Sequence, residues 1–569
     1  MKKVLFLFIC VFSFVSIKAQ LAPHKYLVKF TDKNNSPYSI SNPSQFLSAK
    51  AIARRQNQGI SIKYNDLPVN PAYIDSILNT GVTLLCRSKW FNSVTIYTTD
   101  SLALVKINSF PFVSSVGVVA KIKKDLQKSI CPKKIIDSPV DLHNNSDFLL
   151  NNTSQENANM KINSFDYGLA TNQITMIGGD YLHNQGFSGQ GMTIAIIDAG
   201  FWYVDTIHAF DSLWINSQIL GTKDFVEPGG DVFRKSTHGM MVLSIMGANM
   251  PGQIVGTAPK AKYWLLRSED AATENIIEEY NWASAAEFAD SVGVDVINSS
   301  LGYTVFDGGW MDHTYADMNG HTCPASIAAA TAASKGIIVC NSAGNSGQNP
   351  WHYIGSPADA DSILTVGAVD DQGNYAAFSS TGPSSDGRIK PTVATQGQST
   401  VVVSTNGTPI SGNGTSFSSP VLTGVVACLW QAFPSMTNMQ IMDAVKESAS
   451  QFSNPDSLLG YGIPNFAAAS LILSGVKIDN FDNENTVNIF PNPFNDIVYL
   501  LFFSSDTEYV DVDIYDITGK KVLSLPGLQR NTGYNYFSIG DVINLSKGLY
   551  IVRITSDNKT YSRKIMKVE

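Results

Sequence analysis

The chain has 569 residues, 44% of them hydrophobic and 15% charged, which is enough apolar material for several folded units. A formal net charge of -8 and the lack of any basic run argue against a nucleic-acid partner. The cysteines form no CxxC pattern and no HExxH pattern occurs, so no metal site of the zinc type is expected.

The first nineteen residues have the layout of a secretory signal peptide. Lys2 and Lys3 precede an apolar stretch over residues 4–15, and cleavage is expected after Ala19. The stretch is too short to span a bilayer, and no later stretch reaches about 18 apolar residues, so no transmembrane segment is expected. We therefore expect an exported protein that is secreted or held at the cell surface.

Residues 20–122 indicate a small α+β unit, because short strand-like runs alternate with helical stretches. The expected strands are 26–30, 94–97 and 116–119, and the expected helices are 43–58 and 71–79. Residues 123–162 are polar and rich in Asn, Ser and Lys. Such a segment buries little apolar surface, so it is predicted to be an exposed linker.

Residues 163–474 predict a mostly parallel α/β sheet flanked by helices, because apolar runs alternate with helical segments. The expected strands are 192–197, 261–266, 294–298, 336–340 and 363–369, with helices at 271–292 and 325–335. Three cysteines fall in this unit, so at least one thiol should stay free. Cys340 and Cys428 lie in apolar runs and are predicted to be buried thiols.

The helical pattern stops after a short linker at 475–485. From 486 to 569 the chain alternates apolar and polar residues, as in "YVDVDIYDITGKKV", with Asn-Pro and Thr-Gly turns between the runs. This pattern predicts a small antiparallel β-sandwich.

The stretch "GNGTSFSSPVLTGVVACLW" places small hydroxyl residues directly before an apolar helix. One interpretation is structural: Thr415 or Ser416 caps the helix by accepting a backbone N–H. The other is chemical: Ser416 is a nucleophile at a helix N-terminus, where backbone donors favour developing negative charge. Pro420 is expected in the first turn of this helix, where a missing N–H is tolerated.

Three further residues stand at points where strands or helices begin or end. Asp198 follows the strand in "IAIIDAGF", His238 precedes the apolar helix "MMVLSIMGA", and Asn345 lies in "NSAGNSG" after another strand. Each alone is commonly a turn or structural residue. Functional side chains nevertheless collect at the carboxyl ends of strands in open α/β sheets, so the set predicts one site.

The order Asp198, His238, Ser416 resembles that of the subtilisin-like serine proteases. "TIAIIDAGF", "STHGMMV", "GTSFSSPV", "SSLGY" and "NSAGNSG" match motifs of that family in sequence order over about residues 165–474. The sequence departs from the usual pattern beside the triad, with Ala199 for Ser or Thr, Met240 for Thr, and Phe417-Ser418 for Met-Ala. These departures affect local hydrogen bonding rather than a triad position.

The resemblance implies an exported serine endopeptidase that acts through an acyl-enzyme. His238 would take the proton of the Ser416 hydroxyl, and Asp198 would orient the imidazole. Asn345 and the Ser416 N–H would stabilise the oxyanion. Residues implied in substrate binding are Ser300, Leu301, Gly302, Ala343, Gly344 and Gly355, with large apolar side chains preferred at P1.

Other readings of this region remain open. An α/β-hydrolase esterase needs G-x-S-x-G and the order Ser, Asp, His, neither of which occurs here. A catalytically silent subtilisin-like adhesin would keep the fold without the reaction. No cofactor is required for the proposed chemistry. An oxygen-rich loop could hold structural calcium, and otherwise is a solvated turn; it contains Asp307, Asp312, Asp317 and Asn319.

The flanking units also carry resemblances. Residues 20–122 are similar to subtilisin-type prodomains, which act as folding chaperones and inhibitors, and processing would fall within about 125–162; the alternative is a permanent interaction domain. The tail from 486 resembles the sorting domain of the type IX secretion system, through "NIFPNPFND", "DIYDITGKKV" and "LSKGLYIVRI". The alternative is a carbohydrate- or protein-binding sandwich. The implied partners are peptide substrates, the chain's own prodomain and the secretion machinery.

Overall fold

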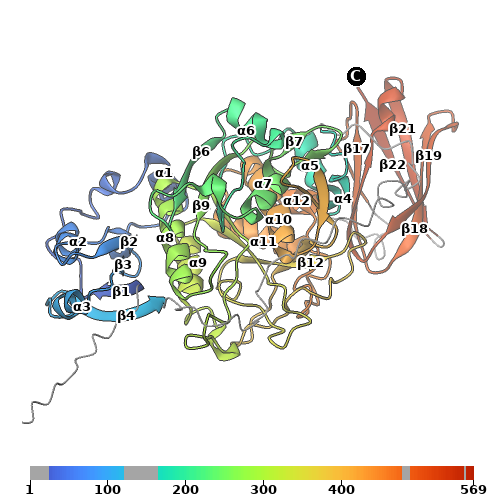
Figure 1. Ribbon diagram of the computed structural model, residues 1–569. Helices are drawn as coiled ribbons and strands as arrows, with labels where there is room; N and C mark the ends of the chain where they lie inside the picture. Colours follow the sequence, from blue (N-terminus) through green and yellow to red (C-terminus); the bar gives the residue numbers. More distant parts are fainter. Residues whose placement is uncertain (1–24, 121–164, 477–486, 557–558, 569) are drawn as a thin grey trace, which may run out of the picture.

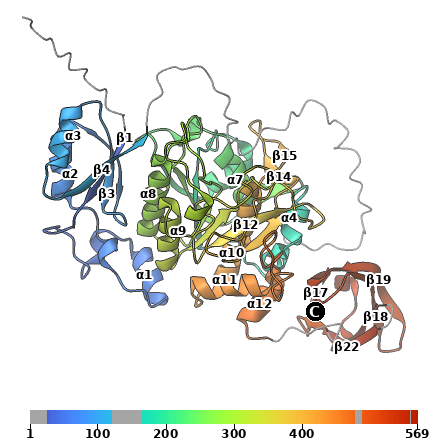
Figure 2. The ribbon, with the colours of Figure 1, turned by 90° about the horizontal axis from the view of Figure 1, so that it is seen from below.

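The computed structural model describes residues 25–120, 165–476, 487–556 and 559–568. They form three units along the chain, and the N-terminal unit and the C-terminal tail lie on opposite sides of the central one (Figures 1 and 2). The expected signal peptide, the processing linker at 123–162 and most of the linker at 475–485 lie outside the described residues. No helix among the described residues is long and apolar enough to cross a membrane.

The N-terminal unit is a four-stranded antiparallel sheet with strand order β2-β3-β1-β4. Its expected strands and helices form, and the sequence pattern missed β2 and α3. The elements are β1 (Lys25–Phe30), α1 (Ala49–Asn57), α2 (Pro71–Leu78), β2 (Thr83–Ser88), β3 (Ser93–Tyr97), α3 (Ser101–Asn108) and β4 (Val113–Ala120).

The central unit is built on a seven-stranded parallel sheet of order β13-β12-β11-β10-β5-β9-β6. The strands are β5 (Thr193–Asp198), β6 (Ile219–Asp224), β9 (Lys262–Arg267), β10 (Val296–Ser299), β11 (Ile338–Ser342), β12 (Leu364–Val369) and β13 (Val393–Gln396). All five strands expected from the sequence occur. Because the sheet is parallel, the carboxyl ends of its strands meet at one edge.

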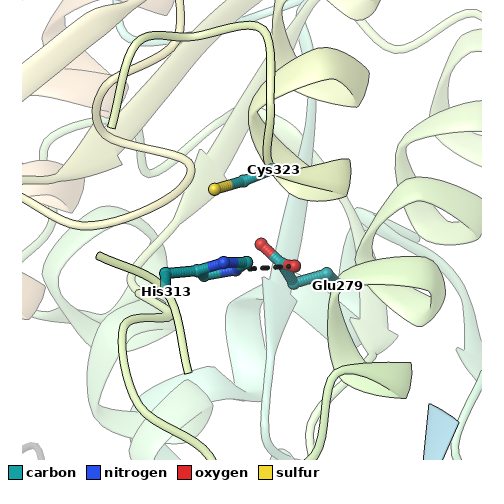
Figure 3. A group of neighbouring side chains, drawn as sticks. All are labelled: Glu279, His313 and Cys323. Atoms are coloured by element: carbon teal, nitrogen blue, oxygen red, sulfur yellow. Dashed lines mark hydrogen bonds and ion pairs between the residues drawn. The ribbon is translucent and has the colours of Figure 1, made fainter. Parts of the chain in front are cut away.

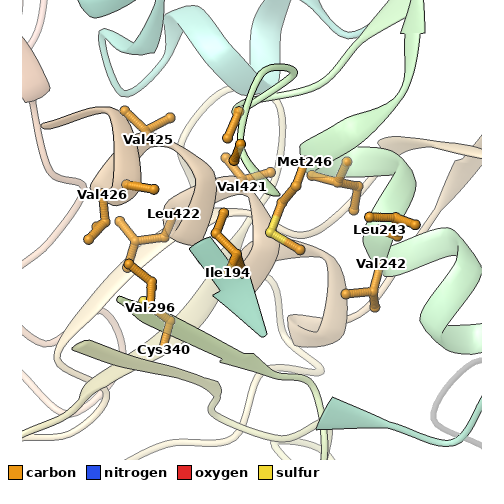
Figure 4. Packing of buried hydrophobic residues seen from close by; sticks show 14 of the residues in the cluster. Ile194, Val242, Leu243, Met246, Val296, Cys340, Val421, Leu422, Val425 and Val426 are labelled. Atoms are coloured by element: carbon orange, nitrogen blue, oxygen red, sulfur yellow. The ribbon is translucent and has the colours of Figure 1, made fainter. Parts of the chain in front are cut away.

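Helices pack against this sheet. They are α4 (Thr171–Thr175), α5 (Gly179–Asn184), α6 (Asp211–Ile215), α7 (His238–Gly247), α8 (Ile277–Val292), α9 (Pro324–Ser334), α10 (Thr415–Ala432), α11 (Asn438–Glu447) and α12 (Phe466–Leu473). Figure 4 shows side chains of α7 and α10 packed against β5, β10 and β11. Two short hairpins complete the unit, β7 (Asn249–Met250) with β8 (Ile254–Val255) and β14 (Thr400–Val403) with β15 (Pro409–Gly412).

The tail contains two antiparallel sheets around one apolar core, as the alternating pattern predicts. Its strands are β16 (Asn488–Phe490), β17 (Val498–Ser504), β18 (Glu508–Asp516), β19 (Lys521–Arg530), β20 (Gly533–Ile539), β21 (Gly548–Ser556) and β22 (Lys559–Lys567). The tail meets the central unit through aromatic rings: Tyr181 of α5 lies 5.3 Å from Tyr499 and 5.8 Å from Tyr536 between ring centroids.

Candidate active site

Three neighbouring strands bring the predicted residues to one edge of the sheet. Asp198 is the last residue of β5, and Ser300 directly follows β10, which pairs with β5. Asn345 follows β11, the next strand along the sheet. The segments 300–302 and 343–345 therefore leave the sheet side by side, where an extended peptide could lie between them.

Asp198 and His238 are in direct contact. The imidazole Nδ1 lies 2.8 Å from Oδ1 and 3.0 Å from Oδ2 of the carboxylate, which is fully buried. The Ala199 N–H donates to Oδ1 at 2.7 Å, so a backbone group also fixes the carboxylate. The Arg267 guanidinium, on the neighbouring strand β9, donates through Nε to the Ala199 carbonyl at 3.1 Å. The loop after β5 is thus held from two sides.

A glycine follows His238 because the backbone around position 239 leaves no room for a side chain. A Cβ at this position would lie 2.4 Å from the Gly200 carbonyl oxygen and 2.9 Å from the Asp198 Cβ. The first turn of α7 therefore approaches the end of β5 more closely than any side chain permits. This close approach brings the His238 ring to the buried carboxylate.

Ser416 is the second residue of α10 and is 1% exposed. Its hydroxyl lies 3.4 Å from the Ser300 carbonyl oxygen, so the helix start adjoins the segment after β10. The ring of the next residue, Phe417, stacks on the His238 imidazole at a centroid distance of 6.3 Å. These contacts bring the start of α10 into the Asp198–His238 neighbourhood. The Ser416 N–H lies in the first helical turn, where amides have no partner within the helix.

Two sequence-based interpretations of the start of α10 differ from the structure, namely the cap and the position of Pro420. Neither Thr415 nor Ser416 caps α10, because Gly414 is the N-cap residue and no side chain makes a cap hydrogen bond. Pro420 is not in the first turn either. It is the sixth residue of the helix, so its missing N–H removes a bond to the Ser416 carbonyl. The Ser300 hydroxyl donates to that carbonyl instead, at 2.9 Å.

Thr415 is a contact residue that the sequence reasoning considered only as a cap. Its N–H and hydroxyl both donate to Asn345 Oδ1, at 2.9 and 3.0 Å, and its oxygen accepts the Gly344 N–H at 3.1 Å. Because the amide oxygen of Asn345 is engaged, the amide NH₂ is directed away from Thr415. The Gly-Thr-Ser motif was the available signal, since it places a second hydroxyl directly before Ser416.

Gly355 occupies a tight place rather than an open one. A Cβ there would lie 2.8 Å from Thr304 Cγ2 and 3.1 Å from the Tyr303 carbonyl oxygen. Its neighbour Ser356 forms a backbone bridge with Tyr303, with N···O distances of 2.7 and 3.1 Å. Gly355 therefore adjoins the segment 300–303, and its close packing is a reason for glycine at this position.

The oxygen-rich loop has the hydrogen bonding of a turn, which was the alternative to a calcium site. Asp312 accepts the Phe306 N–H at 2.7 Å, Asp317 accepts the Thr314 N–H and hydroxyl, and Asn319 accepts the His321 N–H at 2.8 Å. Among the described residues, carboxylate, thiol and imidazole groups converge at two other places, and neither includes Asp307, Asp312 or Asp317. These oxygens act as turn acceptors.

The four described cysteines, Cys86, Cys323, Cys340 and Cys428, are buried free thiols. This confirms the prediction for Cys340 and Cys428. Burial raises the pKa of Cys340 to about 12, which keeps that thiol protonated and inert.

The N-terminal unit is joined to the central unit by buried charges. Asp290 of α8 accepts ion pairs from Arg54 at 2.7 Å, Arg55 at 2.8 Å and Lys89 at 2.9 Å, all from the N-terminal unit. Burial alone would raise the pKa of Asp290, but these three cations lower it below its usual range. A cavity of about 930 Å³ beside this contact contains none of the predicted site residues.

Comparison with known proteins matches all three units. Residues 189–462 match the subtilase family, residues 25–134 the peptidase S8 propeptide domain of Bacteroidota, and residues 488–568 the secretion system C-terminal sorting domain. Subtilisin E of Bacillus subtilis is 30% identical over 52% of this chain and 70% of its own length. Subtilisin of Bacillus pumilus is 29% identical over 52% of this chain and 97% of its own.

Among solved structures, MycP1 from Mycobacterium smegmatis is 21% identical, covers 55% of this chain and 89% of its own, and has a TM-score of 0.41. The family assignment rests on the sequence relatives and on the matched units. The chain belongs to the subtilase family, and it is an exported serine peptidase with an N-terminal propeptide unit and a C-terminal sorting domain.

Proposed function

We propose that this chain is an endopeptidase in which Asp198, His238 and Ser416 form the catalytic triad. The proposal is carried by the contact of the buried Asp198 carboxylate with His238 Nδ1, at 2.8 Å. An imidazole protonated on Nδ1 has a basic Nε2, which can take the proton of the Ser416 hydroxyl as its oxygen attacks a peptide carbonyl. The same proton then passes to the leaving amine, and water hydrolyses the acyl-enzyme.

Asn345 and the Ser416 N–H are the proposed oxyanion donors. Thr415 holds the Asn345 amide oxygen through two hydrogen bonds, which leaves the amide N–H groups for the developing charge. Donors that are oriented before the reaction need no reorganisation in the transition state. Substrate backbone would run beside Ser300, Leu301 and Gly302 on one side and Ala343 and Gly344 on the other.

We propose large apolar P1 residues as the preferred substrates, with Gly355 near the floor of the pocket. No acidic side chain was assigned to this pocket from the sequence, so nothing there would select Lys or Arg. Cleavage of a mixed peptide library by the mature enzyme measures this preference directly. Enrichment of aromatic, Leu or Met residues at P1 is expected, and a profile dominated by Arg, Lys or Asp contradicts the proposal.

The N-terminal unit is proposed to inhibit the enzyme until the linker is cut, and the tail to address the chain to the type IX secretion machinery. The buried ion pairs of Arg54, Arg55 and Lys89 with Asp290 support a specific docked state of the propeptide. The tail's two-sheet core is separate from that of the central unit, which supports an independent addressing module.

The test of the catalytic proposal is Ser416→Ala in purified, refolded full-length protein. Linker cleavage within one chain is an intramolecular reaction with a high effective concentration, so the active protein should separate from residues 20–122. The variant should keep them attached and hydrolyse no peptide. Ser418→Ala is the matched control, because it removes a buried hydroxyl of the same helix, one that donates to the Thr415 carbonyl at 2.9 Å.

Folding of both variants is checked by their melting curves. If folded Ser416→Ala still cleaves its linker at the rate of the active protein, Ser416 is not the nucleophile. Labelling of the active protein by a serine-directed phosphonylating reagent separates a peptidase from a silent adhesin, which would remain unlabelled.

A further inference from the structure

We propose that Glu279, His313 and Cys323 bind a divalent transition metal ion, with zinc as the expected occupant. Glu279 lies in the first turn of α8, His313 in the loop after β10, and Cys323 is the N-cap residue of α9. One ligand atom from each side chain lies within 4.8 Å of the other two. Figure 3 shows the His313 imidazole bonded to the Glu279 carboxylate, with the Cys323 thiol close to both.

The spacing suits a tetrahedral ion. Zinc bonds of about 2.0–2.3 Å place neighbouring ligand atoms roughly 3.3–3.8 Å apart. His313 Nε2 and Glu279 Oε2 are 3.1 Å apart, and the thiol lies within 4.8 Å of both. Shifts of less than about 1 Å would therefore seat the ion, and two metal bonds would replace the present Glu–His hydrogen bond.

The donor types select the metal class. A thiolate, an imidazole and a carboxylate are together typical of zinc and of late first-row metals, whereas calcium and magnesium prefer oxygen ligands alone. A thiolate and a carboxylate would balance the two charges of the ion.

The ligands are buried and oriented by neighbours, unlike a chance cluster of surface acids. Glu279 and Cys323 are fully buried, and the His313 side chain is 9% exposed. Ser356 donates its hydroxyl to Glu279 Oε1 at 2.8 Å, and the Ser356 oxygen lies 2.9 Å from the Ser326 hydroxyl oxygen. These bonds hold one carboxylate oxygen and leave Oε2 turned to the imidazole.

Several acidic side chains lie near the site, and the buried Lys390 interacts with one of them, Asp359. The Cys323 thiol interacts electrostatically with three carboxylates, those of Glu279, Asp359 and Asp317. Asp359 is itself fully buried, with its oxygens bonded to the Ser326 hydroxyl and the Gly320 N–H. A bound dication would offset this charge in a place where water is excluded.

The ion would tie the loop of residues 304–322 to α8 and α9. It would also brace Ser356, whose backbone pairs with Tyr303 beside the proposed substrate segment. The proposed role of the site is therefore structural. It does not depend on the triad assignment, so the two proposals fail independently.

The test uses full-length protein carrying Ser416→Ala, which cannot digest itself. The chain is treated with a chelator, dialysed, and loaded with Zn²⁺ or Co²⁺. We expect one equivalent of zinc by elemental analysis, and with cobalt an absorption band from thiolate-to-metal charge transfer. Cys323→Ser should abolish the band and weaken binding by at least about 100-fold, since even loss of an outer-shell partner typically costs 10–100-fold.

Cys428→Ser is the matched control. Cys428 is also a buried free thiol near an imidazole, at 3.8 Å from His183 Nε2, and it belongs to neither cluster of converging ligands among the described residues. This variant should keep the full stoichiometry and the band. His313→Asn is the second variant if Cys323→Ser fails to fold, and it should shift the cobalt spectrum and weaken binding. The proposal is overturned if the parent protein binds no stoichiometric ion, or if folded Cys323→Ser or His313→Asn binds as the parent does.

Discussion

Ser300→Ala tests how the backbone of Ser416, the proposed nucleophile, is held. Pro420 has no N–H to give to the Ser416 carbonyl, and the Ser300 hydroxyl donates to that carbonyl at 2.9 Å. Both residues are buried. Removing the hydroxyl leaves a buried carbonyl without this donor, which costs about 1–3 kcal/mol. The helix start should loosen, and the free energy of unfolding should fall by that amount.

The reasoning is tested by a double-mutant cycle with Pro420→Ala. Alanine restores an N–H at position 420, which can bond the Ser416 carbonyl within the helix. In the Pro420→Ala background, Ser300→Ala should then lower the free energy of unfolding by clearly less than it does when Pro420 is present. The expected coupling energy between the two substitutions is about 0.5–2 kcal/mol. All four proteins carry Ser416→Ala to prevent autolysis, since that change keeps the backbone carbonyl.

The assay is urea unfolding of the central unit, followed by its tryptophan fluorescence. Pro420→Ala alone also removes a proline from a helix interior, so only the difference between the two Ser300→Ala costs is interpreted. Equal costs with and without the proline would refute the account, because the Ser300 hydroxyl would then not be substituting for the missing N–H.

Two other predictions concern catalysis and pH. Asn345→Leu should lower kcat by about 10²–10³, the loss known for such a donor in subtilisin, with little change in KM; peptide hydrolysis measures this, and an unchanged kcat removes Asn345 from the oxyanion site. Burial raises the pKa of Asp180 from 3.8 to about 7, so the folded state binds this proton more tightly than the unfolded chain. The contribution of Asp180 to the free energy of unfolding is therefore fully present below about pH 4 and is lost as the pH rises through about 7. Asp180→Asn should flatten the melting temperature over that range, and an unchanged slope contradicts the assignment.

Much of the sheet could be predicted because its strands are long, apolar and separated by helices. The expected strands at 192–197 and 363–369 match β5 and β12 within about one residue at each end. The short strand β2 was not predicted because "TLLCRS" has no clear alternation of apolar and polar residues. Which of its residues are buried depends on how the N-terminal unit packs. Local pattern therefore predicts elements that bury both faces better than elements at the edge of a small sheet.

The residues of the proposed triad could be named from the sequence because each belongs to a distinctive short motif. The sequence left both calcium and a solvated turn open for the oxygen-rich loop, because oxygen atoms close in sequence need not converge. In the structure, Asp312 and Asp317 accept hydrogen bonds from the backbone of their own turns. Glu279, His313 and Cys323 show the reverse case. They lie on three separate segments with no fixed spacing, so only the packing of α8 against α9 brings them together.

For Pro420, the sequence correctly predicts the effect of a missing N–H in a helix but places the residue in the wrong turn. The sequence pattern placed it in the first turn, where its missing N–H would affect nothing. In the structure it is five residues beyond Thr415, and the carbonyl that it leaves without a helical partner is that of Ser416. The hydroxyl that satisfies this carbonyl comes from the strand segment proposed to bind substrate. The helix irregularity thus links the proposed nucleophile to the proposed substrate strand, and a regular α10 would lack that link.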